Sequence, residues 1–319
     1  AGGAYLPGLS DQVIVVKNKS KIFLAGPPLL KAALGEIATD EELGGADMHY
    51  TISGLAEHMA KDDDDAIKVC RDVVKNLGWN DNFVSTQKYD FKEPIYSPDE
   101  LIGVVPTDYK KSYDVREVIA RIVDGSEFLD FKPEFGKQTV TGTAAIHGYK
   151  IGIVGNNGPI FADGAVKAAQ FIQLCSKSNI PLIFLQNTTG YMVGTREESK
   201  GIIKHGSKMI QAVTNCTVPK ITLRIGASFG AGEYGMAGRS FDPRFMFSWP
   251  NNKLSVMGGE QAGKTMSQVA TESAKRRGEE PNMEMIKAIE QKIIDTYSEE
   301  GEALFATARL WDDGIIDPR

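Results

Sequence analysis

The stretch Val218-Pro-Lys-Ile-Thr-Leu-Arg-Ile-Gly-Ala-Ser-Phe-Gly-Ala-Gly-Glu-Tyr-Gly-Met236 predicts a strand that leads into a helix through a glycine-rich turn. The apolar run at 221–225 is typical of a strand, small residues at 226–232 indicate the turn, and Glu233 marks the expected start of the helix. Such a turn brings main-chain N–H groups to the positive end of a helix dipole, where they can bind a phosphate, a carboxylate or an enolate oxygen. A tight turn without a ligand is the alternative, because a lone glycine cluster is weak evidence for a site.

A second glycine turn opens the chain. In Ala1-Gly-Gly-Ala-Tyr5 small residues again precede a tyrosine, and the sequence pattern downstream of both turns is similar. After each turn come two β-type runs, a glycine break and a short helical stretch; the breaks are Gly26-Pro-Pro28 and Gly258-Gly-Glu260. This order predicts two copies of one domain. Two facing anion-binding turns would suit a reaction with two oxyanions.

Composition places the chain among ordinary globular proteins. It has 319 residues, 42% hydrophobic and 24% charged, which is enough for two domains with a sizeable core. A net charge of −6 argues against a general nucleic-acid binder, and no apolar run approaches the length of a membrane span. Three distant cysteines fit a reducing compartment better than disulfides or a metal site, and the four histidines lack metal-ligand spacing. We therefore expect no metal.

Repeated strand–loop–helix units along the chain predict an α/β fold in two related halves. Residues 79–110 lose periodicity and gather three prolines, which indicates a linker. The acidic run at 62–65 fits the first turn of a helix capped by Gly78 better than it fits a metal site. The expected strands are 12–16, 22–24, 140–146, 151–154, 181–185, 221–225, 245–249 and 254–257, and the other expected helices are 29–34, 115–123, 165–175, 202–213, 261–269 and most of 283–310. Loops are expected at 155–159 and 186–194, at strand ends where open α/β folds place ligands.

A serine hydrolase is the first enzymatic alternative. Gly226-Ala-Ser-Phe-Gly230 matches the G-x-S-x-G nucleophile motif. That mechanism needs an acid and then a histidine downstream of the serine, and no histidine follows His205. The triad cannot be completed in the expected order, so the motif does not indicate a hydrolase.

The glycine turns and several further motifs resemble the carboxyltransferase β subunit of biotin-dependent acyl-CoA carboxylases, closest to the methylcrotonoyl-CoA and geranyl-CoA members. The resemblance covers nearly the whole chain and implies two crotonase-like domains of repeated ββα units. It places the C-terminal part of the first domain at 1–92, a linker at 93–110 and the second domain at 111–319. The missing start and a missing last helix suggest a truncated subunit. The motifs are Phe23-Leu-Ala-Gly-Pro-Pro28, Glu42-Leu-Gly-Gly-Ala46, Asn187-Thr-Thr-Gly-Tyr-Met-Val-Gly194, Gly201-Ile-Ile-Lys-His-Gly206, Phe229-Gly-Ala-Gly232 and Trp249-Pro…Val256-Met-Gly-Gly-Glu-Gln-Ala262.

The resemblance also implies a mechanism without a side-chain base. In this family carboxybiotin releases CO2, its ureido nitrogen takes the acidic proton of the acyl-CoA, and the enolate recaptures CO2. For 3-methylcrotonoyl-CoA the proton leaves the γ carbon, and the double bond relays charge to the thioester oxygen. By resemblance, Gly2 and Gly3 match the thioester-side oxyanion hole, and Ala231 and Gly232 match the biotin-side hole. The expected substrate and biotin contacts are Tyr5, Gly155, Asn156, Gly190, Tyr191, Phe229 and Tyr234.

The family's partners follow from the same resemblance. They are a separate biotin-carboxylase and biotin-carrier α subunit, acyl-CoA, and further copies of the β subunit, arranged as dimers within a hexameric core. The active sites of the family form between the first domain of one protomer and the second domain of another. The compartment is the cytoplasm in bacteria or the mitochondrial matrix in eukaryotes. Lys31 is a candidate for contact with the CoA phosphates, with a surface lysine as the alternative.

Glu233 departs from the family pattern, which has Asn at this position in the methylcrotonoyl and geranyl members. An unpaired carboxylate beside developing negative charge would oppose catalysis. We expect Glu233 to point away as a favourable partner of the helix dipole. Tyr234 falls at the family's acyl-pocket position, with core packing as the alternative. Other readings of the chain are a decarboxylase or hydratase on the same fold, a propionyl-CoA-type carboxylase subunit, and a non-catalytic scaffold subunit.

Overall fold

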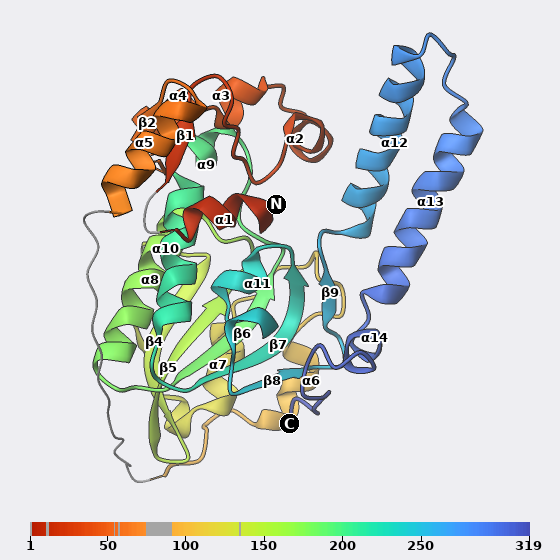
Figure 1. Ribbon diagram of the computed structural model, residues 1–319. Coiled ribbons are helices and arrows are strands. Elements are labelled where there is room, and N and C mark those ends of the chain that lie inside the picture. The colour runs from red at the N-terminus through yellow and green to blue at the C-terminus, as the bar shows by residue number, and fades with distance from the viewer. Residues whose placement is uncertain (1, 11–12, 54, 57, 75–90, 134) are drawn as a thin grey trace.

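The computed structural model describes residues 2–319 apart from 11–12, 54, 57, 75–90 and 134 (Figure 1). A seven-stranded sheet in the order β3-β4-β5-β6-β7-β8, with β9 also paired to β7, forms its centre. The strands are β3 Leu129–Asp130, β4 Thr139–Ile146, β5 Tyr149–Asn156, β6 Leu182–Thr188, β7 Lys220–Phe229, β8 Phe245–Ser248 and β9 Lys253–Ser255. β4 pairs antiparallel with β3 and β5, whereas β5, β6, β7, β8 and β9 pair in parallel.

The β4–β5 hairpin closes through a turn at His147 and Gly148. Both residues adopt positive φ angles, 49° and 77°, as the tight turn of a two-residue hairpin requires. The carboxylate of Asp124 accepts hydrogen bonds from both of their main-chain N–H groups, at 2.8 and 2.7 Å. Asp124 itself is buried, so these two hydrogen bonds fix the turn of the hairpin.

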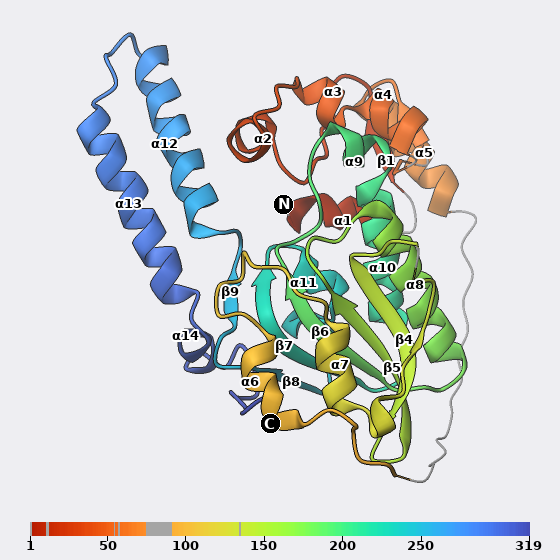
Figure 2. The same ribbon diagram turned by 180° about the vertical axis from the view of Figure 1, so that it is seen from behind.

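Helices cover both faces of the sheet. The pair α8 Ala162–Lys177 and α10 Ile202–Asn215 packs on one face in the largest apolar core, with the short α9 Thr195–Ser199 beside it. The other face is covered by α6 Leu101–Val104 and α7 Arg116–Ile122 (Figure 2), around a second core that includes Val140, Ile153 and Trp249. The short turns η3 Pro98–Glu100 and η4 Asp124–Ser126 flank these two helices.

The N-terminal part lies over the carboxyl ends of the parallel strands (Figure 1). Its own sheet is a parallel pair, β1 with β2. Ala4, Tyr5, Leu24 and Leu55 belong to the same core as α8 and α10, so this part packs onto the second half of the chain. Its elements are η1 Gly2–Ala4, α1 Tyr5–Gly8, β1 Ile14–Val16, α2 Pro27–Leu34, α3 Asp40–Gly44, α4 Ala46–Met48, η2 His49–Ser53, β2 His58–Ala60 and α5 Asp63–Val74.

Local sequence explains where several helices begin and end. α2 begins at Pro27, where a missing N–H costs nothing, and ends at Gly35 with φ of 71°. α3 begins with a capping box in which Thr39 and Glu42 exchange hydrogen bonds. The side chain of Asn282 caps α13 by accepting from Met285 N at 3.0 Å.

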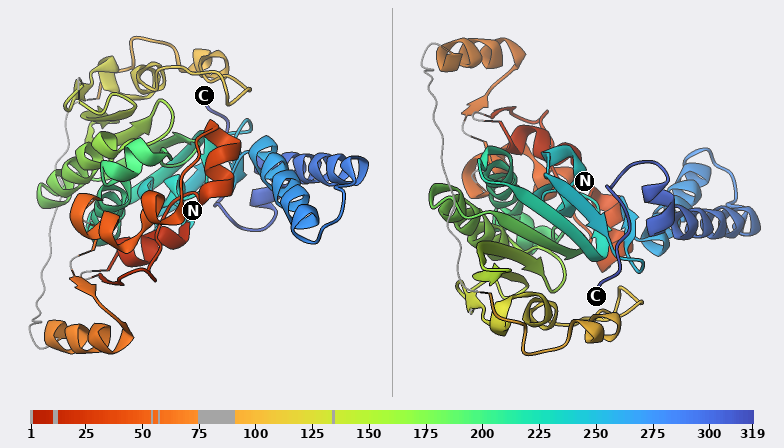
Figure 3. Two further views of the ribbon diagram at one scale, coloured as in Figure 1. Left: turned by 90° about the horizontal axis from the view of Figure 1, so that it is seen from above. Right: turned by 90° about the horizontal axis from the view of Figure 1, so that it is seen from below.

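A long helical hairpin of α12 Gly259–Arg276 and α13 Met283–Glu300 projects from the body of the molecule (Figure 3). The base of α12 follows β9, and α2 of the N-terminal part packs against α12. The chain then passes through α14 Ala303–Thr307 and returns to β8, where Ser248 forms an isolated bridge with Ile315. The C-terminal segment therefore closes the edge of the sheet beside β8.

Most of the predicted elements are present, with three corrections. The stretch 22–24 is not a strand; Lys21 makes only an isolated bridge with Gly45. β5 and β6 continue through Asn156 and Thr188, where loops were expected. β7 continues to Phe229 because β9 pairs with its end, so the true turn starts at Gly230. The predicted cap at Gly78 lies outside the described residues, and the domain boundaries stay a prediction.

Candidate functional site

The main-chain N–H groups of the turn after β7 form the centre of the candidate site. Gly230 has a φ of 58° and donates to Ser255 O at 2.9 Å, which ties the start of the turn to β9. The next two N–H groups, of Ala231 and Gly232, have no hydrogen-bond acceptor among the described residues. They stand at the start of α11 Gly232–Gly235. Adjacent donors at a helix start favour negative charge, so the turn has the geometry of an oxyanion site.

Close packing explains why position 232 is glycine. A Cβ atom there would lie 2.8 Å from Thr188 Cγ2 and 2.9 Å from the Cα of Gly190. Gly190 has a φ of 118°, a conformation that L side chains rarely adopt, and Thr188 hydrogen-bonds on both sides of it. The loop after β6 and the turn after β7 are therefore packed backbone against backbone.

Asparagine side chains hold the end of β7 in place. Asn187, at the irregularity between β6 and β7, accepts from Ala227 N at 3.0 Å. On the other side, Asn252 Nδ2 donates to Gly226 O at 2.6 Å, and Asn251 Nδ2 donates to Ile225 O at 3.1 Å. These bonds satisfy main-chain groups that leave the regular ladder, so the turn starts from a rigid base.

The turn separates two cavities. The first, of about 540 Å³, is bounded by the loop after β6, the turn after β7, α2 and the start of α12. It brings together the predicted residues Gly190, Tyr191 and Phe229 with Ala231. Its further lining residues include Asn157 and Gly158, from the loop expected at 155–159, and Tyr109 and Val256, which sequence reasoning did not identify as part of a site. Tyr109 packs edge-on against Phe229 at a ring distance of 5.1 Å.

The second cavity, of about 570 Å³, contains residues from both glycine turns. Gly2 lines it together with Ala231, Glu233 and Tyr234. A Cβ atom on Gly2 would lie 2.6 Å from the hydroxyl of Tyr234, so the two turns approach each other within one chain. The N–H groups of Gly2 and Gly3 have no acceptor among the described residues. Within one chain, α1 packs on α10 and Gly2 lies beside Tyr234; the expectation that active sites form between two protomers stays a prediction.

Tyr5 does not reach either cavity. It is 1% exposed, and its ring lies 5.1 Å from that of Tyr191 and edge-on to Tyr234 at 6.3 Å. Burial raises the pKa of the Tyr5 hydroxyl. The predicted substrate contact at Tyr5 is thus a core residue that supports Tyr191 and Tyr234 from behind. Tyr234 packs on the core and also lines the second cavity, and its role as the acyl-pocket residue stays a prediction.

Gly155 and Asn156 are likewise buried in the end of β5 and line neither cavity. The next two residues, Asn157 and Gly158, line the first cavity instead. Pairing with β4 extends β5 through Asn156, which shifts the start of the loop by two residues. Lys31 is exposed on α2, and its contact with CoA stays a prediction.

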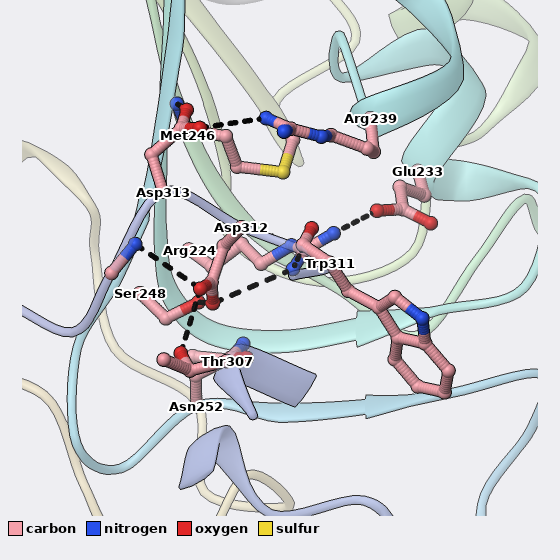
Figure 4. Close-up of polar contacts among 12 residues, drawn as sticks. Arg224, Glu233, Arg239, Met246, Ser248, Asn252, Thr307, Trp311, Asp312 and Asp313 are labelled. Atoms are coloured by element: carbon pink, nitrogen blue, oxygen red, sulfur yellow. Dashed lines mark hydrogen bonds and ion pairs between the residues drawn. The ribbon is translucent and has the colours of Figure 1, made fainter. Parts of the chain in front are cut away.

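Glu233 is paired, contrary to the expectation that it simply points away along the helix dipole. Its carboxylate accepts from Nη2 of Arg224, a side chain that is 1% exposed (Figure 4). The negative charge beside the turn is therefore compensated by a buried cation. Ser228 lies inside β7 and is fully buried, so it is not at a nucleophile elbow.

Glu198 on α9 is a buried carboxylic acid near the first cavity. It is 2% exposed, and Oε1 accepts from Leu24 N at 3.3 Å. Burial raises the pKa of Glu198 from 4.5 to about 7. Between those two values the folded chain keeps a proton that the unfolded chain releases, so stability falls as the pH rises through this range and stays lower above it.

We expect Glu198→Gln to remove this dependence. Relative to the original chain, the variant should gain stability between pH 4.5 and pH 8, by up to about 3 kcal/mol. Urea unfolding curves at several pH values measure the difference, with Glu284→Gln on the exposed side of α13 as the matched loss of one carboxylate. A difference that stays constant from pH 4.5 to pH 8 would show that Glu198 ionises normally.

The described residues contain no group of three metal-ligating side chains and no helix that is long and apolar enough to cross a bilayer. What the site offers is main-chain donors and apolar walls.

Comparisons with known proteins agree with this geometry. A family model described as the carboxyl transferase domain matches residues 1–319. The chain is 50% identical over 319 residues to the mitochondrial methylcrotonoyl-CoA carboxylase beta chain of Dictyostelium discoideum, covering 100% of this chain and 54% of that protein.

Two solved structures cover the whole chain. The geranyl-CoA carboxylase beta subunit of P. aeruginosa is 54% identical with a TM-score of 0.68, and 59% of that chain is covered. The transcarboxylase 12S structure, whose title describes a hexamer assembly, is 32% identical with a TM-score of 0.60, and 60% of it is covered. The chain therefore spans a little over half the length of these proteins.

Proposed function

Because the chain belongs to the carboxyl transferase domain family, we propose that it forms part of a carboxyltransferase subunit that moves a carboxyl group from carboxybiotin to an acyl-CoA, with 3-methylcrotonoyl-CoA as the substrate. The observation that carries the proposal is the pair of N–H groups at Ala231 and Gly232, which find no acceptor in the described part of the chain and lie between two cavities, one of them shared with Gly2. Donors fixed in this way stabilise an oxygen that gains negative charge in the transition state.

The site residues fit an acyl thioester on one side and a ureido ring on the other. Carboxybiotin, when bound, supplies both CO2 and the base that removes the substrate proton. The chain's own contribution is then to bind, to orient and to exclude water. Ala231 and Gly232 would donate to one oxyanion, and the Gly2–Gly3 turn to the other. Phe229, Tyr191 and Val256 supply apolar walls to the first cavity, which strengthens those hydrogen bonds by keeping water away.

Geranyl-CoA is the second candidate substrate. It is favoured by the 54% identity to the geranyl-CoA carboxylase beta subunit. A hydratase would need two acidic residues poised over the enoyl bond. The described carboxylates that line the two cavities are Glu233, Glu260 and Glu300. They do not offer such a pair, because Glu233 is bound to Arg224 and Glu260 to Lys110 at 2.6 Å, which leaves Glu300 by itself.

The proposed partners are those of the family: a biotin-carrying α subunit, and further copies of the subunit in a hexameric core. The relative whose title describes a hexamer supports the second of these. The proposed compartment is the bacterial cytoplasm or the mitochondrial matrix, the latter supported by relatives named mitochondrial.

Carboxylation by the full-length subunit, assembled with its biotin-bearing partner, tests the function directly. Incorporation of labelled bicarbonate into methylcrotonoyl-CoA, geranyl-CoA and propionyl-CoA should be greatest for methylcrotonoyl-CoA and should be abolished by avidin. Greatest incorporation into geranyl-CoA would reassign the substrate. An assembly that co-purifies without an avidin-reactive protein and carboxylates none of the three would contradict the proposal.

A further inference from the structure

A buried cation lies directly behind the turn after β7. Arg224 lies in the middle of β7, flanked across the sheet by Gln186 of β6 and Ser248 of β8. Its side chain is 1% exposed. Removing a guanidinium from water is costly unless the charge is paired and hydrogen-bonded. The partners of Arg224 therefore decide what this residue does.

Those partners come from two distant segments (Figure 4). Nη2 donates to Oε1 of Glu233, in the first turn of α11. Nη1 donates to the carbonyl oxygen of Trp311 at 3.4 Å, and the carboxylate of Asp312 lies 3.9 Å from it. Arg224 thus connects the turn to the segment that closes the edge of the sheet.

The two carboxylates depend on Arg224 to different degrees. Asp312 already accepts from the hydroxyls of Ser248 and Thr307, both at 2.6 Å, and from Gly314 N at 3.2 Å. In the described part of the chain, the carboxylate of Glu233 hydrogen-bonds to Arg224 alone. If Arg224 were lost, Asp312 would keep its three hydrogen-bond donors. The Glu233 carboxylate would lose the donor that it has among the described residues.

The turn is held at both ends. At its start, Gly230 N donates to Ser255 O at 2.9 Å. At its end, the main-chain oxygen of Glu233 accepts from Gly238 N at 2.8 Å, while the side chain is held by Arg224. Between these anchors lie Ala231 and Gly232, whose N–H groups have no acceptor among the described residues.

From these contacts we propose that Arg224 is the positioning residue of the Ala231–Gly232 turn: through its ion pair with Glu233 it fixes the direction of the two N–H groups and neutralises a carboxylate that would repel an oxyanion bound there. The inference rests on the proposed function for the identity of that oxyanion. It does not depend on that function for the geometry of the turn.

Three variants of the full-length subunit in its assembly separate positioning from general support. Arg224→Met leaves the Glu233 carboxylate unpaired beside the developing charge, and kcat should fall by about 100-fold while KM for the acyl-CoA changes by less than about threefold. Glu233→Gln keeps a hydrogen-bond acceptor and should lose about tenfold or less in kcat. The double variant Arg224→Met/Glu233→Gln removes both charges, so its kcat should exceed that of Arg224→Met by about tenfold.

The matched control is an exposed pair at the tip of the helical hairpin. Arg277 and Glu279 form an ion pair at 2.9 Å in which both side chains are 59% exposed. Arg277→Met, Glu279→Gln and their double variant should leave kcat and KM unchanged. A double variant at 224 and 233 that is no better than Arg224→Met, or a loss confined to KM, would overturn the positioning role.

A second measurement is independent of turnover. Hydrogen–deuterium exchange of the segment 226–236 should speed up in Arg224→Met, whereas the segment 151–156 on β5, which β6 separates from β7, should exchange as before. If the unaltered assembly carboxylated none of the acyl-CoAs tested, the proposed function would fail and exchange would still decide the inference. Unchanged exchange at 226–236 would refute it.

Discussion

Gly232→Ala is expected to lower the carboxylation rate of the full-length assembly by about 100- to 1000-fold, the usual cost of losing one oxyanion-hole donor. The added methyl group would lie 2.8 Å from Thr188 Cγ2 and 2.9 Å from the Cα of Gly190. Contacts this short cannot persist, and the backbone of Gly190 cannot yield without disturbing the loop that lines the first cavity. The turn must move instead, and with it the N–H group of residue 232.

The loss should appear in kcat, measured as labelled bicarbonate incorporation at saturating acyl-CoA. Gly103→Ala on α6 is the matched control, because a Cβ atom there meets nothing within 4 Å, and its rate should equal that of the unaltered enzyme. Gly232→Ala activity within about threefold of normal would mean that the donors at this turn contribute little to the transition state.

The existence of the strand and helix around the turn could be predicted from the local sequence pattern. The residue at which the strand ends could not, because it depends on pairing with another strand. The strand at 221–225 and the helix start next to Glu233 are confirmed, because an apolar run after Pro219 and a glycine cluster are local signals. The extension of β7 to Phe229 is not local. It depends on β9, which pairs with Ala227, Ser228 and Phe229 from a segment far along the chain. Taken alone, the glycine and serine residues at 226–228 favour a turn, but pairing with β9 keeps this segment in the strand.

The candidate site likewise contains residues that could be identified from local sequence and contacts that depend on distant parts of the fold. The glycines of the turns could be identified from sequence and resemblance, and at Gly230 and Gly232 the close approach of other main-chain atoms requires them. The partner of Glu233 could not be identified in this way. Arg224 and Glu233 come together because the chain turns back between β7 and α11. One signal was available: a charged residue within an apolar strand has to find a buried partner. The burial of Tyr5 could not be predicted from local sequence, because it depends on α10, some 200 residues later in the chain.

Asp312→Ala should destabilise the folded chain by roughly 3–5 kcal/mol, the cost of breaking a buried ionic network by removing one member. The Asp312 side chain is fully buried and accepts from Ser248 Oγ, Thr307 Oγ1 and Gly314 N. Its removal leaves these three donors without an acceptor and takes a negative charge from beside Arg224 (Figure 4). The segment at 311–316 should then detach from β8 first, since its bridge to Ser248 adjoins this network.

Urea unfolding of the full chain measures the loss, and three comparisons interpret it. Asp312→Asn keeps the shape and one acceptor oxygen, so it should fall between Ala and the original chain. Asp317→Ala removes an exposed carboxylate that pairs with Arg319 in the same C-terminal segment, and should cause no measurable loss. If Asp312→Ala were no less stable than Asp317→Ala, the donors of Ser248 and Thr307 would have to be satisfied by water. The segment at 311–316 would then not be what holds Arg224 in position next to the turn.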